Sequence, residues 1–284
     1  MEALALPFFQ TAAIAALVLA GIHAYLGFHI VRRGVLFVDL ALAQMAALGV
    51  AIGIVLGREH DEAGSYLLAL GMTFVGAALF AWLRGRSQRV PLEAFIGIVF
   101  ATAQALVFLV LEKSPSGPEH LKETLVGSLF TVDPAHIGRV AVLYAIVGAV
   151  HFVLRKPFFE ITNDTHGENP KGRRVFWWDF LFYATFGLVV TSSVQIAGVL
   201  LVFGFLVIPA VAGLMASSRP GPALVIGWVF GFTASVVGLL GSVTFDMPAT
   251  PSILVTLTGL LLVHGLALAV WRRMRSTRMN KGVS

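Results

Sequence analysis

The chain has 284 residues, of which 57% are hydrophobic and only 12% are charged, and its mean hydropathy is +0.87. Soluble domains carry about 25% charged residues, so this composition excludes an ordinary water-soluble protein and indicates a protein of the lipid bilayer. The net charge of +5 does not indicate nucleic-acid binding, because the basic residues form short clusters between apolar runs, and the lack of cysteine excludes disulfides and thiolate metal ligands.

Apolar runs of the length that crosses a membrane, roughly 20 helical residues, recur along the chain. The sequence predicts an all-α transmembrane bundle with one transmembrane domain over 1–284 and nine spans, at 8–31, 35–57, 64–83, 92–111, 136–154, 176–193, 195–216, 222–245 and 252–271. The run 176–216 is divided at Thr191–Gln195, its best place for a turn, and without that turn the count is eight.

The charges orient these spans. "MEALALPFFQ" has no cationic segment, so we expect no cleaved signal peptide and an N-terminus outside the cell. One side then receives 16 of the 20 basic residues, which the positive-inside rule makes the cytoplasmic side. These are Arg32, Arg33, Arg84, Arg86, Arg89, Arg155, Lys156, Lys171, Arg173, Arg174, Arg219, Arg272, Arg273, Arg275, Arg278 and Lys281. The tail 272–284 is therefore expected in the cytoplasm.

Polar side chains lie within the first two spans. At about 1.5 Å per residue, Gln44 and His23 lie roughly 14 and 12 Å from the cytoplasmic ends of their spans, so at matching depth. Asp39 is only about 6 Å deep, which predicts pairing with Arg32 or Arg33. Imidazole and carboxylate suit Zn²⁺, Mn²⁺ or Fe²⁺, and an amide is a weaker ligand. Instead of binding a metal ion, each of these polar side chains could form a hydrogen bond to a neighbouring helix.

Glycines repeat at four-residue spacing on two spans, at Gly49, Gly53 and Gly57 and again at Gly227 and Gly231. Small residues at this spacing let helix backbones approach closely in lipid, so we expect helix contacts there without a role in transport.

The loops carry two features. Acidic residues gather in outer loops at 59–62 and 112–123, where they either attract cations or are ordinary hydrated side chains. The longest cytoplasmic loop, 155–175, is either a solvated connector or a docking surface for a cytosolic partner. The sequence contains no G-x-x-x-x-G-K-[ST] phosphate loop, nucleophile elbow or HExxH zinc motif, so we expect no enzyme, and any ATP must be bound by another chain.

One long motif resembles a known family. "VQIAGVLLVFGFLVIPA" (Val194–Ala210) fits the pattern Q-x-x-G-x-x-L-x-x-x-x-L-x-x-P-A at Gln195, Gly198, Leu201, Leu206, Pro209 and Ala210. Three weaker matches follow the family's order: "AFIGIVF" (94–100), "LVGSLFTVD" (125–133) and "FDMPATPS" (245–252). The sequence is thus similar to the ABC-3 type membrane permeases of metal-ion (zinc, manganese or iron) ABC importers.

This resemblance implies a multi-pass protein of the bacterial inner membrane that pairs with a second permease chain, as a homodimer or, with a related chain, as a pseudo-dimer. It implies cytosolic ABC ATPase subunits that bind ATP and Mg²⁺, an extracytoplasmic metal-binding protein that delivers the ion, and no cofactor bound by this chain. The ATPase would dock on the 155–175 loop at Glu160, Asp164 and Gly167.

The sequence departs from the family where metal ligands are expected. The family pattern is R-R followed by G-D-x-x-x-H. A Gly follows five residues beyond the His. Aligned on the arginines, Asp39 matches the Asp but Ala43 stands in place of the His; with Gly49 aligned on that Gly, Gln44 takes the His position and Leu40 replaces the Asp. The candidate metal residues are therefore Gln44, Asp39 and His23.

Two other functions stay open at this stage. One is a permease of the same fold for a metal chelate or another small solute. The other is an ion-coupled secondary transporter, which predicts inverted repeats and essential carboxylates at the membrane midplane, and the sequence has no clear example of either.

Overall fold

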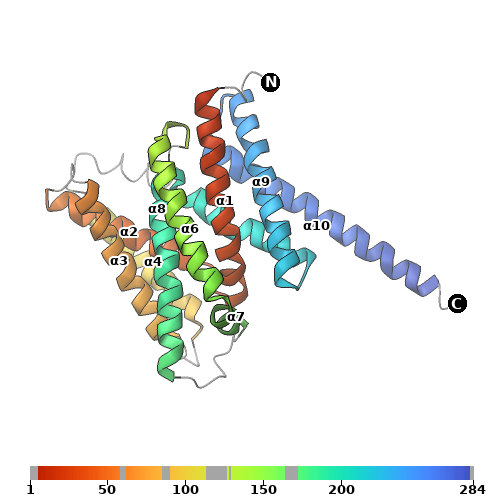
Figure 1. The fold of residues 1–284 in the computed structure, drawn as a ribbon, viewed down its shortest axis with the longest axis horizontal. Helices are drawn as coiled ribbons and strands as arrows, with labels where there is room; N and C mark the ends of the chain where they lie inside the picture. Colours follow the sequence, from red (N-terminus) through yellow and green to blue (C-terminus); the bar gives the residue numbers. More distant parts are fainter. Residues whose placement is uncertain are drawn as a thin grey trace. The chain divides into compact units, whose positions relative to one another are not determined.

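The computed structural model describes residues 6–57, 62–84, 90–112, 127, 129–163 and 172–281. These residues form helices and no strand, so the all-α prediction is confirmed. In chain order the elements are α1 (Pro7–Arg33), α2 (Val38–Val55), α3 (Glu62–Leu83), α4 (Leu92–Leu111), the 3₁₀ turn η2 (Leu129–Thr131), α6 (Pro134–Val153), α7 (Arg155–Asn163), α8 (Gly172–Ala216), α9 (Pro220–Thr244) and α10 (Ala249–Lys281) (Figure 1).

Eight helices in the described part of the chain are long and apolar enough to cross a membrane. Seven of them coincide with predicted spans. The eighth, α8, takes the place of two, since its apolar stretch Val175–Ala216 has 42 residues. A helix of that length extends about 63 Å, twice the hydrocarbon thickness of about 30 Å, so it has the length for two crossings.

The break predicted inside this stretch at Thr191–Gln195 is wrong. These residues are helical, and the one residue with non-helical dihedral angles inside α8 is Gly198 (φ 71°, ψ 163°). The hydroxyl groups that suggested a turn bond to neighbouring helices instead. Thr191 Oγ1 lies 3.1 Å from Thr73 Oγ1 of α3, Ser192 Oγ lies 3.0 Å from the Tyr66 hydroxyl of α3, and Ser193 Oγ bonds the Tyr144 hydroxyl of α6.

Gly198 breaks the helix beside a second glycine. Gly127, just before η2, also has a positive φ of 65°, and a methyl group on its Cα would lie 2.3 Å from the carbonyl carbon of Ala197 and 2.4 Å from Gly198 N. Only residues without a side chain tolerate both this conformation and this approach. Gly127 therefore packs directly on the backbone at the break in α8.

The chain divides into two compact units, here named the central unit (His29–Phe203) and the terminal unit (Met1–Phe28 with Gly204–Ser284). In the central unit α2 packs against both α3 and α4. Leu48 and Ala51 of α2 form a buried cluster with Val107 and Leu111 of α4.

The glycine spacing on α2 serves helix contact, as expected. Gly49 lies against the backbone of α3, where a methyl group would come within 2.4 Å of the Leu68 carbonyl oxygen, and Gly53 faces Ser65. Gly57 differs, because it follows the end of α2 and no neighbouring atom lies within 4 Å of its methyl position.

In the terminal unit α9 packs against α10 and against the second part of α8. Gly227 and Gly231 both approach Pro209, which lies inside α8. The indole N–H of Trp228 donates to the Gly21 carbonyl oxygen of α1 at 2.8 Å. The second glycine pair therefore also brings helix backbones together.

Candidate functional site

The first part of the 155–175 segment is helical. Its first nine residues form α7, which begins one residue after α6 ends. Phe158 and Thr162, one turn apart, are fully buried, whereas Arg155, Lys156 and Glu160 are exposed. The helix is thus amphipathic, with one packed face and one polar face. Glu160, a predicted docking residue, lies on the polar face; the other two, Asp164 and Gly167, lie outside the described residues.

Aromatic contacts hold the packed face of α7. The Phe158 ring lies 4.5 Å from the His151 ring of α6, and the Phe159 ring lies 4.7 Å from the His29 ring of α1, centroid to centroid. His151 is fixed in turn by a 2.8 Å hydrogen bond between its Nε2 and Thr185 Oγ1 of α8. Both histidines are therefore buried packing partners of α7, and the hydrogen bond of His151 ties it to α8.

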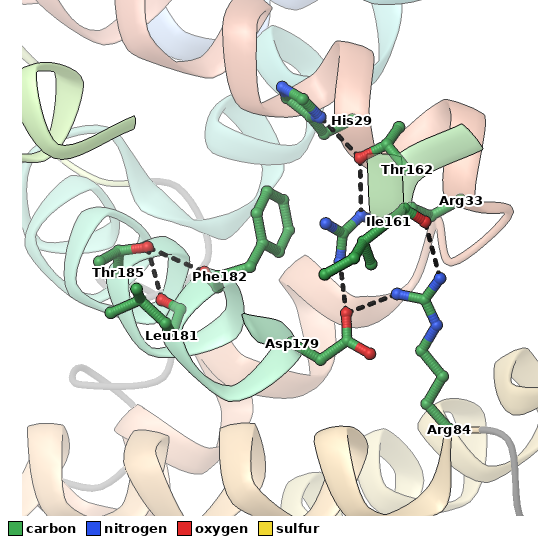
Figure 2. A network of polar contacts seen from close by, with 9 residues as sticks. All are labelled: His29, Arg33, Arg84, Ile161, Thr162, Asp179, Leu181, Phe182 and Thr185. Atoms are coloured by element: carbon green, nitrogen blue, oxygen red, sulfur yellow. Dashed lines mark hydrogen bonds and ion pairs between the residues drawn. The ribbon is translucent and has the colours of Figure 1, made fainter. Parts of the chain in front are cut away.

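A cluster of polar residues continues from the last turn of α7 (Figure 2). We name it the Asp179 cluster; it consists of His29, Arg33, Arg84, Thr162 and Asp179. Thr162 Oγ1 accepts a hydrogen bond from Arg33 Nε at 3.1 Å and lies 2.8 Å from His29 Nδ1. Arg33 Nη1 and Arg84 Nη1 both donate to the same oxygen, Asp179 Oδ1, at 3.0 and 2.5 Å. Arg84 Nη2 also donates to the Ile161 carbonyl oxygen of α7 at 2.9 Å.

The Asp179 cluster joins four helices, because its members come from α1, α7 and α8 and, in the case of Arg84, from the residue directly after α3. It is largely withdrawn from solvent: the side chains of Arg33, Arg84 and Asp179 are 2%, 15% and 0% exposed. Two cations face one carboxylate, and the Arg33 guanidinium also lies 3.8 Å from the centroid of the Phe182 ring, which favours a cation. A buried ion pair of this kind adds little net stability while intact, but losing one partner is costly.

Reasoning from the sequence missed Asp179. The signal was available, because "FWWDFLF" places a single carboxylate inside an apolar run, and an ionisable residue in a membrane span marks a functional site by default. His29 and His151 carried the same signal.

The pairing predicted for Asp39 is wrong. Arg33 bonds Asp179, and Arg32 Nη1 donates to Asn163 Oδ1 at 3.0 Å. Asp39 itself lies in the first turn of α2, fully buried, and neither of its carboxylate oxygens has a hydrogen-bond partner among the described residues. It is therefore a buried carboxyl group without a hydrogen-bond partner among the described residues.

The other two candidate metal residues differ from Asp39. Gln44 is buried on the same helix, but residues five apart on an α-helix point about 140° away from each other, so the two side chains lie on different faces. His23 belongs to the terminal unit, where its Nδ1 lies 2.7 Å from the Leu19 carbonyl oxygen one turn earlier. Among the described residues no group of three or more His, Asp or Glu side chains forms a metal site.

These features define an α-helical, multi-pass membrane protein with a buried charged cluster against a short amphipathic helix. Comparison with known proteins is more specific, and the chain belongs to the ABC 3 transport family, which it matches over residues 5–268. Members of this family are membrane permeases of ABC transporters rather than enzymes, so the chain is a multi-pass protein of the bacterial inner membrane.

Individual relatives are distant but matched over most of their length. The "Manganese transport system membrane protein MntC" of Listeria monocytogenes is 22% identical over 88% of this chain and 87% of its own. The "High-affinity zinc uptake system membrane protein ZnuB" of Haemophilus influenzae is 22% identical over 86% of this chain and 91% of its own. A solved structure, PsaBC from Streptococcus pneumoniae in complex with Fab, has the same fold, with a TM-score of 0.76, 22% identity and 93% of each chain covered.

Proposed function

We propose that the chain is the permease subunit of an ABC importer that moves a divalent transition-metal ion, manganese, zinc or iron, with ATP bound by partner subunits. Membership of the ABC 3 transport family and the relatives named for manganese and zinc support this proposal. The observation that carries it is α7: a short helix anchored on one face to three longer helices, with its charged face exposed, suits the docking of a cytosolic ATPase.

Charge supports the orientation in which α7 lies in the cytoplasm and the N-terminus lies outside. Arg32, Arg33 and Arg84 at the ends of α1 and α3 surround α7, which itself begins with Arg155 and Lys156. Such a concentration of basic residues is typical of cytoplasmic membrane edges. The exposed face with Arg155, Lys156 and Glu160 is then the surface presented to the ATPase.

Asp39 is the leading candidate for contact with the transported ion. A buried carboxylate without a hydrogen-bond partner among the described residues is costly to keep, unless a cation or a second chain completes its surroundings. Its oxygens suit Mn²⁺ and, with imidazole, Zn²⁺ or Fe²⁺. A second copy of the chain would supply a second Asp39. Gln44 and His23 remain candidates for weaker contacts along the path.

Docking is tested by co-purification of the full chain with the ABC ATPase encoded nearest to it, followed by measurement of ATP hydrolysis. We expect a stable complex with faster hydrolysis than the ATPase alone. Glu160→Lys reverses a charge on the exposed face of α7 and should weaken the complex, whereas Glu112→Lys, at an exposed glutamate after α4, should not. Failure of the unmodified chain to bind the ATPase or to stimulate hydrolysis would refute the proposal.

Transport is tested in proteoliposomes that contain the complex and its binding protein, with radioactive Mn²⁺, Zn²⁺ and Fe²⁺ as separate probes. We expect ATP-dependent uptake of at least one ion, which Asp39→Asn abolishes and Gln44→Ala reduces less. ATP-dependent uptake only of a chelated ion would favour the chelate permease. Uptake without ATP that collapses with the proton or sodium gradient would favour a secondary transporter.

A further inference from the structure

We propose that the Asp179 cluster is the joint that connects α7 to the ends of α1, α3 and α8, so that Thr162, Arg33, Arg84 and Asp179 are positioning residues for transport. The proposal rests on the function proposed above, in which an ATPase acts on α7. It assigns the transmission of that action to a few named hydrogen bonds rather than to general packing.

The dimensions of α7 make these bonds important. A helix of nine residues is about 14 Å long and is not stable by itself, so its position is set by what it contacts. Its last turn makes three bonds with arginines: the Thr162 hydroxyl bonds Arg33 and the Asn163 amide oxygen bonds Arg32, both of α1, and the Ile161 carbonyl bonds Arg84, which directly follows α3. Two of these arginines, Arg33 and Arg84, belong to the Asp179 cluster, so a displacement of this turn must move both of their guanidinium groups or break their bonds.

Both arginines meet at one atom, Asp179 Oδ1 of α8. Because the two bonds share this oxygen, a movement of either arginine changes the electrostatic environment of the other. The cluster is small and shielded from water, and its hydrogen bonds fix the direction of each side chain. The ring contacts of Phe158 and Phe159 are less directional, so they allow α7 to slide against its neighbours.

The cluster also has an obvious second arrangement. Arg33 Nη2 and Asp179 Oδ2 are buried and have no hydrogen-bond partner among the described residues, although Arg33 Nη1 and Asp179 Oδ1 are already bonded. These are the two atoms that a bidentate arginine–carboxylate pair would join. In that arrangement Arg33 would hold both oxygens of Asp179 by itself, so that Asp179 would keep a cation even if Arg84 moved away with Ile161 and α7. Two discrete arrangements are what a coupling element requires.

The test measures metal-ion uptake and ATP hydrolysis in the same proteoliposomes of the permease–ATPase complex and takes their ratio. Thr162→Val keeps the shape of the side chain and removes the hydroxyl, so we expect uptake per ATP to fall about tenfold, within the range of mutations that alter coupling. Thr162→Ser restores a hydroxyl and should restore the ratio. A role in stability alone would lower the amount of complex but leave the ratio unchanged.

Thr73→Val is the matched control. Thr73 is also fully buried and also bonds another helix through its hydroxyl, to Thr191 of α8, but it lies 11 residues before Arg84, about 16 Å along α3. It should leave the ratio unchanged. If Thr73→Val and Thr162→Val lower the ratio equally, or if neither lowers it, the proposed role of the Asp179 cluster in transport is refuted.

A second pair of variants keeps the test decisive if Thr162→Val does not fold. Arg84→Gln removes the bonds to Asp179 and Ile161 from a partly accessible side chain, and should lower uptake per ATP by a similar factor. Arg272→Gln removes an arginine of α10 that bonds the Met215 carbonyl oxygen in the terminal unit, and should not. An unchanged ratio in Arg84→Gln overturns the joint; absence of ATP-driven uptake in the unmodified complex overturns the proposed function instead.

Discussion

The contact between Gly127 and the break in α8 gives the sharpest prediction for stability. We expect Gly127→Ala to destabilise the protein by about 2–5 kcal/mol. A non-glycine residue at a φ of 65° costs about 1–2 kcal/mol. The new methyl group would also lie 2.3 Å from the Ala197 carbonyl carbon, and overpacking against a backbone that must shift costs typically about 1–3 kcal/mol more.

The assay is thermal unfolding of the purified chain in detergent, followed by tryptophan fluorescence. For a chain of this size, a loss of about 2–5 kcal/mol corresponds to a fall in Tm of roughly 4–20 °C. The matched control is Gly138→Ala, because Gly138 lies inside α6, where a methyl group would meet no atom within 4 Å. It should raise stability by about 0.5–1 kcal/mol through helix propensity. Equal Tm values for Gly127→Ala and the unmodified chain would refute the close approach.

Three further predictions concern single side chains. Asp179→Asn leaves the buried guanidinium group of Arg33 and the partly buried one of Arg84 without a carboxylate and should lower the free energy of unfolding, measured by SDS titration, by about 3–5 kcal/mol. Asp39→Asn should leave that free energy unchanged or raise it, because the carboxylate has no hydrogen bond among the described residues to lose; a marked loss would show that a protein group stabilises it. Trp228→Phe removes the bond to the Gly21 carbonyl and should cost about 1 kcal/mol in the same titration, and no change would count against that bond.

The fold could be predicted from the sequence because membrane spans are long and nearly free of charge. Helix α4 begins and ends where the apolar run 92–111 does, and α2, α3 and α9 differ from their predicted spans by only a few residues. The error lay at Thr191–Gln195, where hydroxyl groups were read as a turn. In lipid a hydroxyl is as readily satisfied by a neighbouring helix, and only the structure places Thr73, Tyr66 and Tyr144 opposite them.

The candidate site was harder to predict, because ion pairs are a matter of distance in space. Arg33 is six residues from Asp39 and 146 from Asp179, and sequence proximity favoured the wrong partner. The aspartate in "FWWDFLF" was visible in the sequence, but nothing there connected it with Arg84 or with a helix inside the 155–175 segment. The amphipathic pattern of residues 155–163 was the indication of that helix in the sequence, and the burial of Phe158 and Thr162 is visible only in the structure.

The sharing of one carboxylate oxygen by two arginines also constrains how this family can evolve. A single substitution at Arg33, Arg84 or Asp179 alters the charge balance of a buried group, so an intermediate with one change is penalised. The three positions should therefore vary together among related permeases: a lineage that loses the aspartate should also have replaced at least one of the arginines. Co-variation of these positions among related sequences would be evidence for the cluster that does not depend on any structure.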